Sequence, residues 1–548
     1  MRKFEPKKFS LAKLHKLMYV FYLLIFVGAI LRVYNITWGA PYFFHPDERN
    51  IASAVTRISP ENFNPEFFAY GSLPIYAIYA TGVLVNFLQN TGDSPINIFS
   101  VSFENAIVIS RIFSSLFSIG IILLLFKVRK FLSGFAFGVT LLTSVFSVGF
   151  IQYAHFGTFE MWLTFFTFLL FIFFVYFLQE KKLRYYFFAA VVFGILVSVK
   201  VSSSVLIVSF PLILFLYFKK LNLRNMIKNI FLYTIAALLI TIDIFLISNP
   251  YFLLDNSSYL SSLSYESGVA TGNLYVFYTG RFFETIPVIF QVVRVFPFLI
   301  NPLNTLLLVV SILIMTYLGV RKRDVFILLT LAFFFLVFIS QAFLFVKWNR
   351  YMVPALPFIY ILIGILSGLF IEKAKVLSQE MRRWILLGAV SFFSILFSFS
   401  FFITTYFSDT RVEAAQWAMK NIPSDAKIAS EVYDLGVVPF ESHFSSIKLL
   451  NTYELDNEEE VPSLDEYEYF LLPSPRILRS RMQLPDKFPK GHEFYKKIFS
   501  EDGDFRLIYN TPCDLLCKIT YLGDPIFFLE ETANVFDRPT VLIYEKKN

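Results

Sequence analysis

Eleven long apolar runs constrain the fold of this chain more than any other feature of its sequence. Each run is about long enough to cross the hydrocarbon core of a membrane as a helix. They cover residues 17–34, 106–126, 133–153, 159–178, 185–199, 203–218, 230–248, 302–319, 325–346, 352–370 and 384–405. Together with the 56% of hydrophobic residues in the whole chain, these runs exclude an ordinary soluble protein. We therefore predict a polytopic α-helical membrane protein with about eleven spans.

Clusters of Lys and Arg follow every second run. They are Lys127, Arg129 and Lys130; Lys181, Lys182 and Arg184; Lys219, Lys220, Arg224 and Lys228; Arg321, Lys322 and Arg323; and Lys373, Lys375, Arg382 and Arg383. The positive-inside rule places these loops and the basic N-terminus in the cytoplasm, and an odd number of spans then places the C-terminal part outside. No small-residue cleavage site closely follows the first run, which we expect to be retained. The predicted location is the plasma membrane.

The chain divides into two parts of opposite charge. The membrane part, residues 1–405, contains two long external loops, 35–105 and 249–301, in which we expect interfacial helices. From Tyr406 onward Asp and Glu exceed Lys and Arg by nine, whereas the preceding part has an excess of 16 basic residues. Because the basic residues belong to membrane loops, they do not indicate a nucleic-acid partner.

Residues 406–548 read as a small soluble extracytoplasmic domain of the α/β or α+β class. Asp409 is placed to cap a helix, and residues 427–433, 467–472 and 540–544 have the composition of strands. Cys513 and Cys517 are the two cysteines. Their spacing and predicted compartment allow a disulfide, and two free thiols remain the alternative.

The stretch from Phe44 to Asn50 contains adjacent carboxylates, Asp47 and Glu48, just beyond the first span. An enzyme that acts on a lipid-borne substrate would need its base at this level, near the headgroups. The simpler explanation is a helix start, since Pro46 suits a first helical position and acids suit the first turn. Both interpretations can hold together.

Further polar residues lie at the outer ends of the predicted spans, where charges are costly. The candidates are His155 and Glu160 before span four, Lys200 between spans five and six, Asp243 in span seven, and Lys347, Arg350 and Tyr351 between spans nine and ten, with Tyr70 in the first external loop. Lys200 could simply snorkel, Asp243 could pair with a basic neighbour, and His155 could be a satisfied buried histidine. All of these residues, however, are predicted to lie on the same membrane face as Asp47 and Glu48. Together they would bring acids and bases into one external cavity.

Such a set suits group transfer from a lipid phosphate. A phosphate monoester is a competent leaving group, so Arg or Lys must neutralise it and no general acid is needed. One carboxylate must take the proton of an incoming hydroxyl or amine. A single base opposite the departing phosphate gives inversion at the sugar carbon, by analogy with glycosidases.

The chain resembles the GT-C glycosyltransferases that use polyprenyl-phosphate sugars, close to family 39, which contains the protein O-mannosyltransferases and the aminoarabinose transferases of lipid A. Asp47 and Glu48 match the acidic pair after the first span of that family, residues 152–160 resemble its second acidic motif, and residues 350–354 resemble its Arg-Tyr-x-x-Pro turn. The second motif usually carries Asp where this chain has Glu160. The resemblance covers residues 17–370, and the soluble tail is similar to those of bacterial and archaeal members.

The resemblance implies that Asp47 is the base, that Glu48 supports it, and that Arg350 and Lys200 bind the donor phosphate, with Lys347 a further candidate. The expected donor is a polyprenyl-phosphate hexose or pentose, and the acceptor a protein hydroxyl, a lipid or a glycan. Two acids and a histidine that face one cavity could hold a metal, but a phosphate monoester donor does not require one, so we predict no metal and no cofactor. Two alternatives stay open: a transporter that uses Asp243, Lys200 and Glu160 as a path, and a non-catalytic scaffold for envelope assembly.

Overall fold

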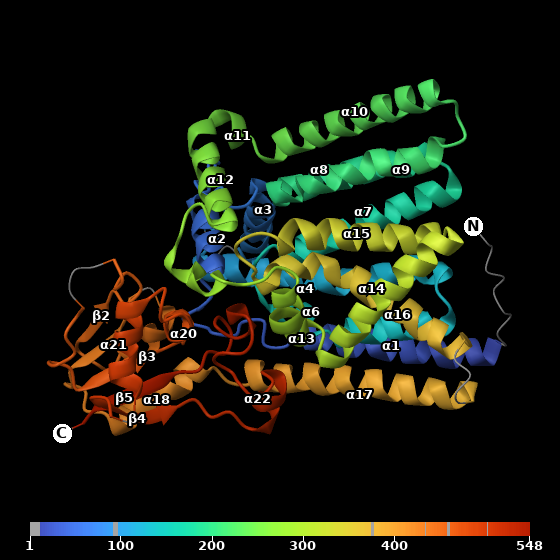
Figure 1. Cartoon of the computed structure of the whole chain (residues 1–548). Coiled ribbons are helices and arrows are strands. Elements are labelled where there is room, and N and C mark those ends of the chain that lie inside the picture. The colour runs from blue at the N-terminus through green and yellow to red at the C-terminus, as the bar shows by residue number, and fades with distance from the viewer. Residues whose placement is uncertain are drawn as a thin grey trace.

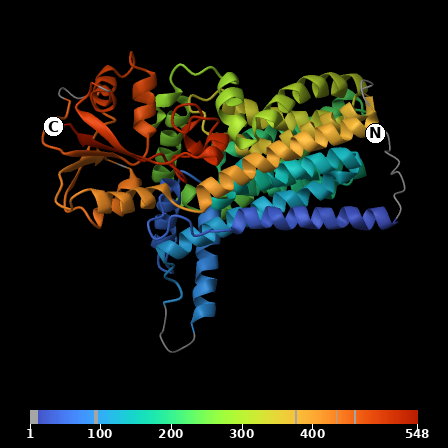
Figure 2. The same cartoon turned by 90° about the horizontal axis from the view of Figure 1, so that it is seen from below.

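The computed structural model describes residues 11–90, 97–373, 378–432, 434–457, 461–500 and 502–547. Long helices run side by side through one part of the molecule, and a small sheet domain lies against one end of them (Figure 1). The N-terminal end of α1 (Leu11–Val33) lies at the opposite end of the bundle (Figure 2). The two parts correspond to the apolar and the acidic regions of the sequence.

All eleven apolar runs are helical. They form α1, α4 (Phe103–Val128), α5 (Gly134–Val145) with α6 (Val148–His155), α7 (Glu160–Glu180), α8 (Leu183–Val199), η2 (Val201–Val208) with α9 (Ser209–Phe218), α10 (Leu223–Ser248), α14 (Pro302–Lys322), α15 (Val325–Ala342), η5 (Asn349–Ala355) with α16 (Leu356–Lys373), and α17 (Gln379–Tyr406). α5 and α6 meet at a bend of 42°, and α8 and the apolar part of α1 are shorter than the rest. The predicted multi-pass helical membrane fold is confirmed.

Within the described residues nine helices are long and apolar enough to cross a membrane, or ten if the bent pair counts as one span. One of the nine is α3 (Ser72–Gln89), which belongs to the first external loop. α3 runs across the direction of the long helices rather than along it (Figure 2). Length and composition alone therefore count it as a span, although its direction is that of a helix lying at the end of the bundle.

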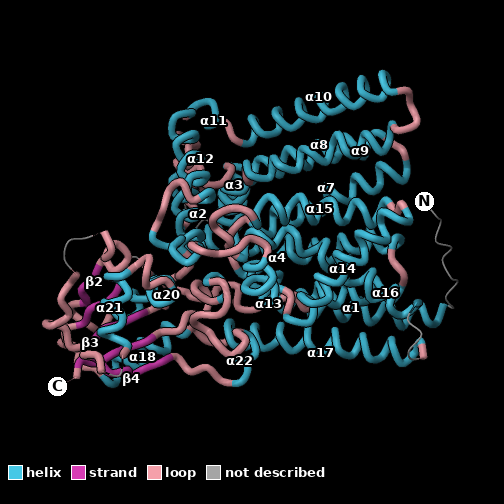
Figure 3. The backbone as a smooth tube through the Cα atoms, viewed as in Figure 1, coloured by secondary structure: helices cyan, strands magenta, loops and turns pink. Residues whose placement is uncertain are grey.

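The two external loops contain most of the remaining helices of the membrane part. The first holds α2 (Pro46–Arg57) and α3, and the second holds α11 (Tyr251–Leu254), α12 (Asn256–Thr271), η3 (Phe277–Phe282), η4 (Gln291–Val295) and α13 (Phe296–Leu299). Loops and short helices collect between the bundle and the sheet domain (Figure 3). Charged side chains from distant parts of the sequence meet in this region.

The C-terminal domain is a mixed five-stranded sheet with helices packed on it. Its strands are β1 (Ile428–Glu431), β2 (Ile447–Leu450), β3 (Tyr469–Leu472), β4 (Phe505–Asn510) and β5 (Leu542–Lys546), in the order β2-β1-β3-β5-β4. β1 pairs in parallel with β2 and β3, whereas β5 pairs antiparallel with β3 and β4. The predicted strands correspond to β1, β3 and β5, with Tyr433 outside the described residues. β2 and β4 are additional to those predicted.

The helices of this domain are α18 (Thr410–Asn421), α19 (Val438–Glu441), α20 (Arg476–Gln483), α21 (Pro489–Phe499) and α22 (Leu515–Thr520). Asp409 caps α18 as expected, since its carboxylate accepts a hydrogen bond from the amide of Arg411 at 2.9 Å. Cys513, just before α22, forms a disulfide with Cys517 within that helix, which confirms the first of the two alternatives. α22 packs against the end of α17 and so ties the sheet domain to the bundle.

Candidate functional site

The two adjacent carboxylates lie in the first turn of α2. Pro46 occupies the first helical position, and Asp47 and Glu48 follow it. A helix start is therefore present, and it directs the two neighbouring side chains to different partners. Because successive residues on a helix point about 100° apart, one helical turn can serve two separate environments.

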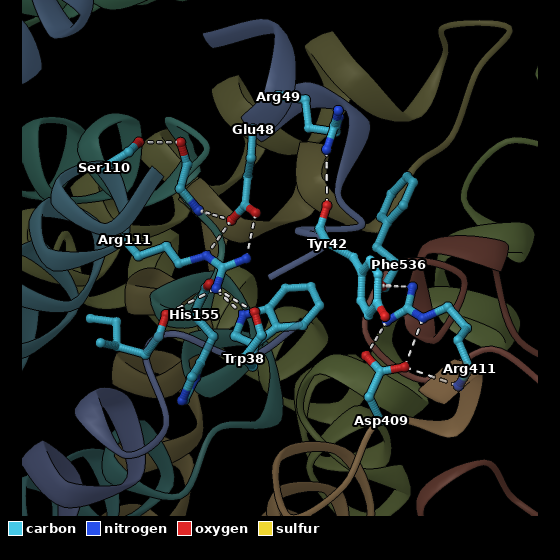
Figure 4. Close-up of polar contacts among 12 residues, drawn as sticks. Trp38, Tyr42, Glu48, Arg49, Ser110, Arg111, His155, Asp409, Arg411 and Phe536 are labelled. Carbon is cyan, nitrogen blue, oxygen red and sulfur yellow. Dashed lines mark hydrogen bonds and ion pairs between the residues drawn. The ribbon is translucent and has the colours of Figure 1, made fainter. Parts of the chain in front are cut away.

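Glu48 is enclosed in an ion pair with Arg111 of α4. Arg111 Nη2 and Nε donate to the two carboxylate oxygens at 2.6 and 2.9 Å, and both side chains are fully buried. The amide of Gly157 donates to the same carboxylate at 2.5 Å. The remaining guanidinium nitrogen donates to the carbonyls of Ile36 and Trp38 (Figure 4). This network satisfies both charges and joins α2 to α4 and to the α6–α7 turn.

Asp47 pairs instead with Arg350, which lies in η5. This pair is partly accessible, with 26% of the Asp47 side chain and 19% of the Arg350 side chain exposed. Burial raises the pKa of the Asp47 carboxyl, but the charges of Arg350 and then His45 more than offset it, so its pKa lies below its usual range. Asp47 is therefore a carboxylate at neutral pH, and Arg350 holds one of its two oxygens.

Lys200 lies beside this pair, at the turn between α8 and η2. Its ammonium group is 5.2 Å from the ring centre of Tyr70 and 5.4 Å from that of Tyr351. Burial lowers the pKa of Lys200, and the positive charge of Arg350 lowers it further. Lys200 and Arg350 thus form two neighbouring cations, of which Arg350 pairs with Asp47.

A close backbone approach positions Tyr70 against Lys200. The amide of Gly71 donates to the carbonyl of Val199 at 2.9 Å. A Cβ atom at position 71 would lie 1.8 Å from the Ser198 carbonyl oxygen, so this approach requires glycine. The amide of Ser72 then donates to the side chain of Asn249 at 2.6 Å. The two external loops are joined at the point where Tyr70 meets the cation.

A narrow cavity of about 60 Å³ opens beside Lys200 and Arg350. Its polar lining consists of Glu160, Thr167, Lys200, Ser202, Ser203, Ser340, Gln341, Arg350 and Tyr351, and its apolar lining of Leu163, Val205, Leu206, Val337 and Pro354. Glu160 is buried there, and its Oε2 has no hydrogen-bond partner in the described part of the chain. The cavity therefore joins a charged end to an apolar wall built from spanning helices.

Three predicted site residues lie away from this cavity. Both ring nitrogens of His155 contact backbone carbonyls, of Ile151 at 2.8 Å and Tyr34 at 2.9 Å, so this side chain is a satisfied core histidine. Asp243 is exposed on α10 and does not line the cavity. Lys347 is buried and donates to the carbonyl of Phe345 at 3.0 Å.

The structure adds residues that sequence reasoning missed. Arg111 had a usable signal, since it is a charge inside an apolar run. Arg476 of α20 contributes to the low pKa of Asp47 and pairs with Glu531 at 3.1 Å, and no local pattern marks it. Glu266 of α12 lies near Lys200. Burial raises the pKa of Glu266, and the positive charge of Lys200 partly opposes this rise.

Within the described ranges, no three His, Cys, Asp or Glu side chains lie close enough to hold a metal ion.

The C-terminal domain packs directly on the Asp47 turn. The Phe536 ring lies 4.2 Å from that of His45, and the Arg411 guanidinium lies 3.7 Å from the ring centre of Phe44. Arg411 also donates to the carbonyl of Phe536 at 2.8 Å (Figure 4). The soluble domain is thus part of the wall around the acidic pair.

A second set of contacts joins the same domain to the other site segments. The side-chain amide of Gln152 donates to Asp537 at 3.1 Å, and the amide of Asn349, beside Arg350, donates to Glu530 at 3.0 Å. Burial raises the pKa of Asp537 to about 7, and burial together with the charge of Glu531 raises that of Glu530 to about 7. The segment around residues 530–537 thereby contacts both of the later sequence motifs.

No family model matches the sequence, and no curated protein matches it either. Solved structures do. The apo oligosaccharyltransferase of Archaeoglobus fulgidus superposes with a TM-score of 0.51 at 10% identity, over 96% of this chain and 88% of that one. ArnT of Cupriavidus metallidurans bound to undecaprenyl phosphate gives a TM-score of 0.46 at 11% identity, over 98% of each chain. The first likeness shows the architecture, and this chain has the GT-C fold of the oligosaccharyltransferase.

Proposed function

We propose that the protein is an integral membrane glycosyltransferase that transfers a sugar from a polyprenyl-phosphate donor to an acceptor on the outer side of the plasma membrane. The observation that carries this proposal is the position of Arg350. It pairs with Asp47 on one side and lines the cavity with Lys200 on the other. A phosphate-binding cation and a base are therefore in contact, at the end of a cavity with apolar walls.

The donor fits this cavity by its chemistry. Its phosphate would bind between Lys200 and Arg350, whose guanidinium can hold two phosphate oxygens at once. Its prenyl chain would follow the apolar residues of α7, η2 and α15, including Leu163, Leu206 and Val337. Since the cavity holds only about 60 Å³, side chains must move on binding. The simplest movement takes Arg350 from Asp47 toward the phosphate, which frees the carboxylate.

The transfer step then needs one base and no acid. Asp47 takes the proton of an acceptor hydroxyl or amine while that oxygen or nitrogen attacks the anomeric carbon. The bond from this carbon to the phosphate oxygen breaks, and its electron pair leaves with the polyprenyl phosphate, whose charge Arg350 and Lys200 neutralise. Attack opposite the leaving phosphate inverts the configuration. Glu48 and Arg111 hold the helix turn on which Asp47 lies.

A transporter is less well supported, because Asp243 is exposed on α10 and does not extend a polar path from Lys200 and Glu160. A scaffold would not need two neighbouring cations at a cavity, one of them paired with a carboxylate. The outward orientation of the C-terminal domain follows from the charge pattern of the loops and is part of the proposal.

The test is donor turnover by the full-length protein in detergent. The purified chain would be incubated with a panel of polyprenyl-phosphate sugars, labelled in the sugar, and with an envelope extract as the source of acceptor. We expect labelled product and free polyprenyl phosphate from at least one donor, and neither from Asp47→Asn. Binding of labelled donor without any transfer would support the scaffold, and uptake of free sugar into proteoliposomes would support the transporter.

A further inference from the structure

A second cavity lies between the membrane part and the C-terminal domain, and it shares no lining residue with the cavity beside Lys200. It has a volume of about 390 Å³. One wall is the segment 281–294 of the second external loop, and the other is formed by Ser480, Gln483 and Leu484 at α20. We call it the outer arginine cavity, after Arg281 and Arg294 in its lining.

Backbone carbonyls fix both arginines. Arg281 Nη2 donates to the carbonyl of Phe527 at 2.7 Å, and Arg294 Nη1 donates to that of Phe528 at 2.6 Å. Arg281 is only 7% exposed, yet its Nη1 has no hydrogen-bond partner among the described residues. A guanidinium carries five N–H donors. Arg294 is partly exposed and gives one donor to the Phe528 carbonyl, so other donors of its guanidinium can reach an acceptor in the cavity.

The charged side chains in the lining are two arginines and one carboxylate. The carboxylate is that of Glu284, and it is exposed. The carboxylates of Glu530, Glu531 and Asp524 lie within electrostatic range of Arg281 and partly offset its charge, but none of them forms an ion pair with it among the described residues. The lining itself thus has one positive charge in excess, and Arg294, which is partly exposed, is the cation best placed to meet an anion.

The mouth of the cavity is apolar. Ile286, Ile289 and Val293 are 62%, 56% and 41% exposed and lie in its lining. They precede the spanning helix α14, which begins at Pro302, so they lie at the outer end of the bundle, where headgroups meet acyl chains. Exposed aliphatic side chains beside two arginines match a ligand with an apolar body and an anionic end.

We propose that the outer arginine cavity binds the phosphate of an anionic membrane lipid. The phosphate accepts hydrogen bonds from Arg281 and Arg294, and the acyl chains lie along Ile286, Ile289 and Val293. The lipid then joins the external loop to α20 of the C-terminal domain. This site is separate from the donor cavity, so the proposal does not rest on the proposed function.

Native mass spectrometry of the full-length protein in detergent tests it, with phosphatidylglycerol as the probe. We expect one tightly held phosphatidylglycerol, with binding weakened by about tenfold or more in Arg281→Gln and in Arg294→Gln, since each loses a charge-assisted contact. Arg321→Gln is the matched control, because Arg321 is exposed at the other end of α14. It should bind as the unchanged protein does.

Arg294→Gln keeps the test decisive if Arg281→Gln fails to fold, because Arg294 is only partly buried. Equal phosphatidylglycerol binding by Arg294→Gln and Arg321→Gln would overturn the proposal. Phosphatidylcholine, which is zwitterionic, should bind more weakly than phosphatidylglycerol, and equal binding would also overturn it. Millimolar inorganic phosphate should not displace the lipid; displacement would show a site for free anions instead.

Discussion

Asp47 and Glu48 are neighbours in the chain, but their surroundings differ in almost every respect. Glu48 and Arg111 are fully buried, and all three guanidinium nitrogens of Arg111 and both oxygens of Glu48 are hydrogen-bonded. Asp47 and Arg350 are partly exposed beside a cavity, and Arg350 Nε has no hydrogen-bond partner in the described part of the chain. A fully buried ion pair such as Glu48–Arg111, the closed pair, is suited to stabilising the fold. A partly exposed one such as Asp47–Arg350, the open pair, can exchange a partner for a ligand. The acidic motif thus combines a fixed member and a reactive one.

The largest expected effect is on catalysis at the open pair. Asp47→Asn keeps the shape of the side chain and removes the base, so transfer should fall by ~10²–10⁴ while donor binding remains. Single-turnover rates with saturating donor measure it. Asp243→Asn is the control, because this acid is exposed on α10 and does not line the cavity. Near-normal transfer by Asp47→Asn would reduce Asp47 to a helix-start residue.

At the closed pair the expected loss is in stability. Glu48→Gln leaves the Arg111 charge buried and unpaired, and such changes cost about 3–5 kcal/mol. The double variant Glu48→Gln with Arg111→Met removes both charges and should recover part of the loss, as a double-mutant cycle of unfolding in detergent would show. Additive losses in that cycle would mean that the two residues act independently.

A smaller change is expected when the donor-binding cation is altered. Arg350→Ala should weaken donor binding about tenfold to a hundredfold, the range for a lost charged hydrogen bond. Arg350→Lys should restore it only in part, because a point charge cannot hold two phosphate oxygens as a planar fork does. Titration with polyprenyl phosphate checks both, and equal affinity in the three proteins would remove Arg350 from the donor site.

The smallest effect is a shift in pH dependence. In the native protein Arg350 lowers the pKa of Asp47, whereas burial alone raises it. Arg350→Gln should therefore raise this pKa and move the acidic limb of the residual rate to higher pH. By linkage, the pair stabilises the fold above the carboxyl pKa of the unfolded chain, and this contribution is lost as pH falls through the lowered native pKa. An unmoved limb would assign that limb to another group.

The sequence predicted the elements that depend on local pattern. Apolar runs located the spans, and their charged flanks placed Asp47 and Arg350 on one face, where the structure pairs them. It did not predict Arg476, which reaches the Asp47 region only through the packing of a separate domain. β2 and β4 were missed because both carry exposed positions, whereas the predicted strands β1, β3 and β5 are mostly buried. Asp243 was predicted to lie at the cavity but does not line it. The position of a charge within an apolar run indicates how deep the residue lies in the membrane, but not toward which side of the helix it points.

The contact between Arg350 and Asp47 also has a consequence for the order of events in catalysis. While Arg350 holds the carboxylate, it lowers the pKa of Asp47 and so weakens the base that an acceptor or a water molecule would meet. A ligand that draws the guanidinium away strengthens Asp47 as a base, and in the proposed reaction that ligand is the donor phosphate. The kinetic scheme should then be ordered, with donor first and acceptor second, and polyprenyl phosphate should act as a competitive inhibitor toward the donor. Once the donor is bound, the released base can also activate water, so slow hydrolysis of the donor is expected when no acceptor is present.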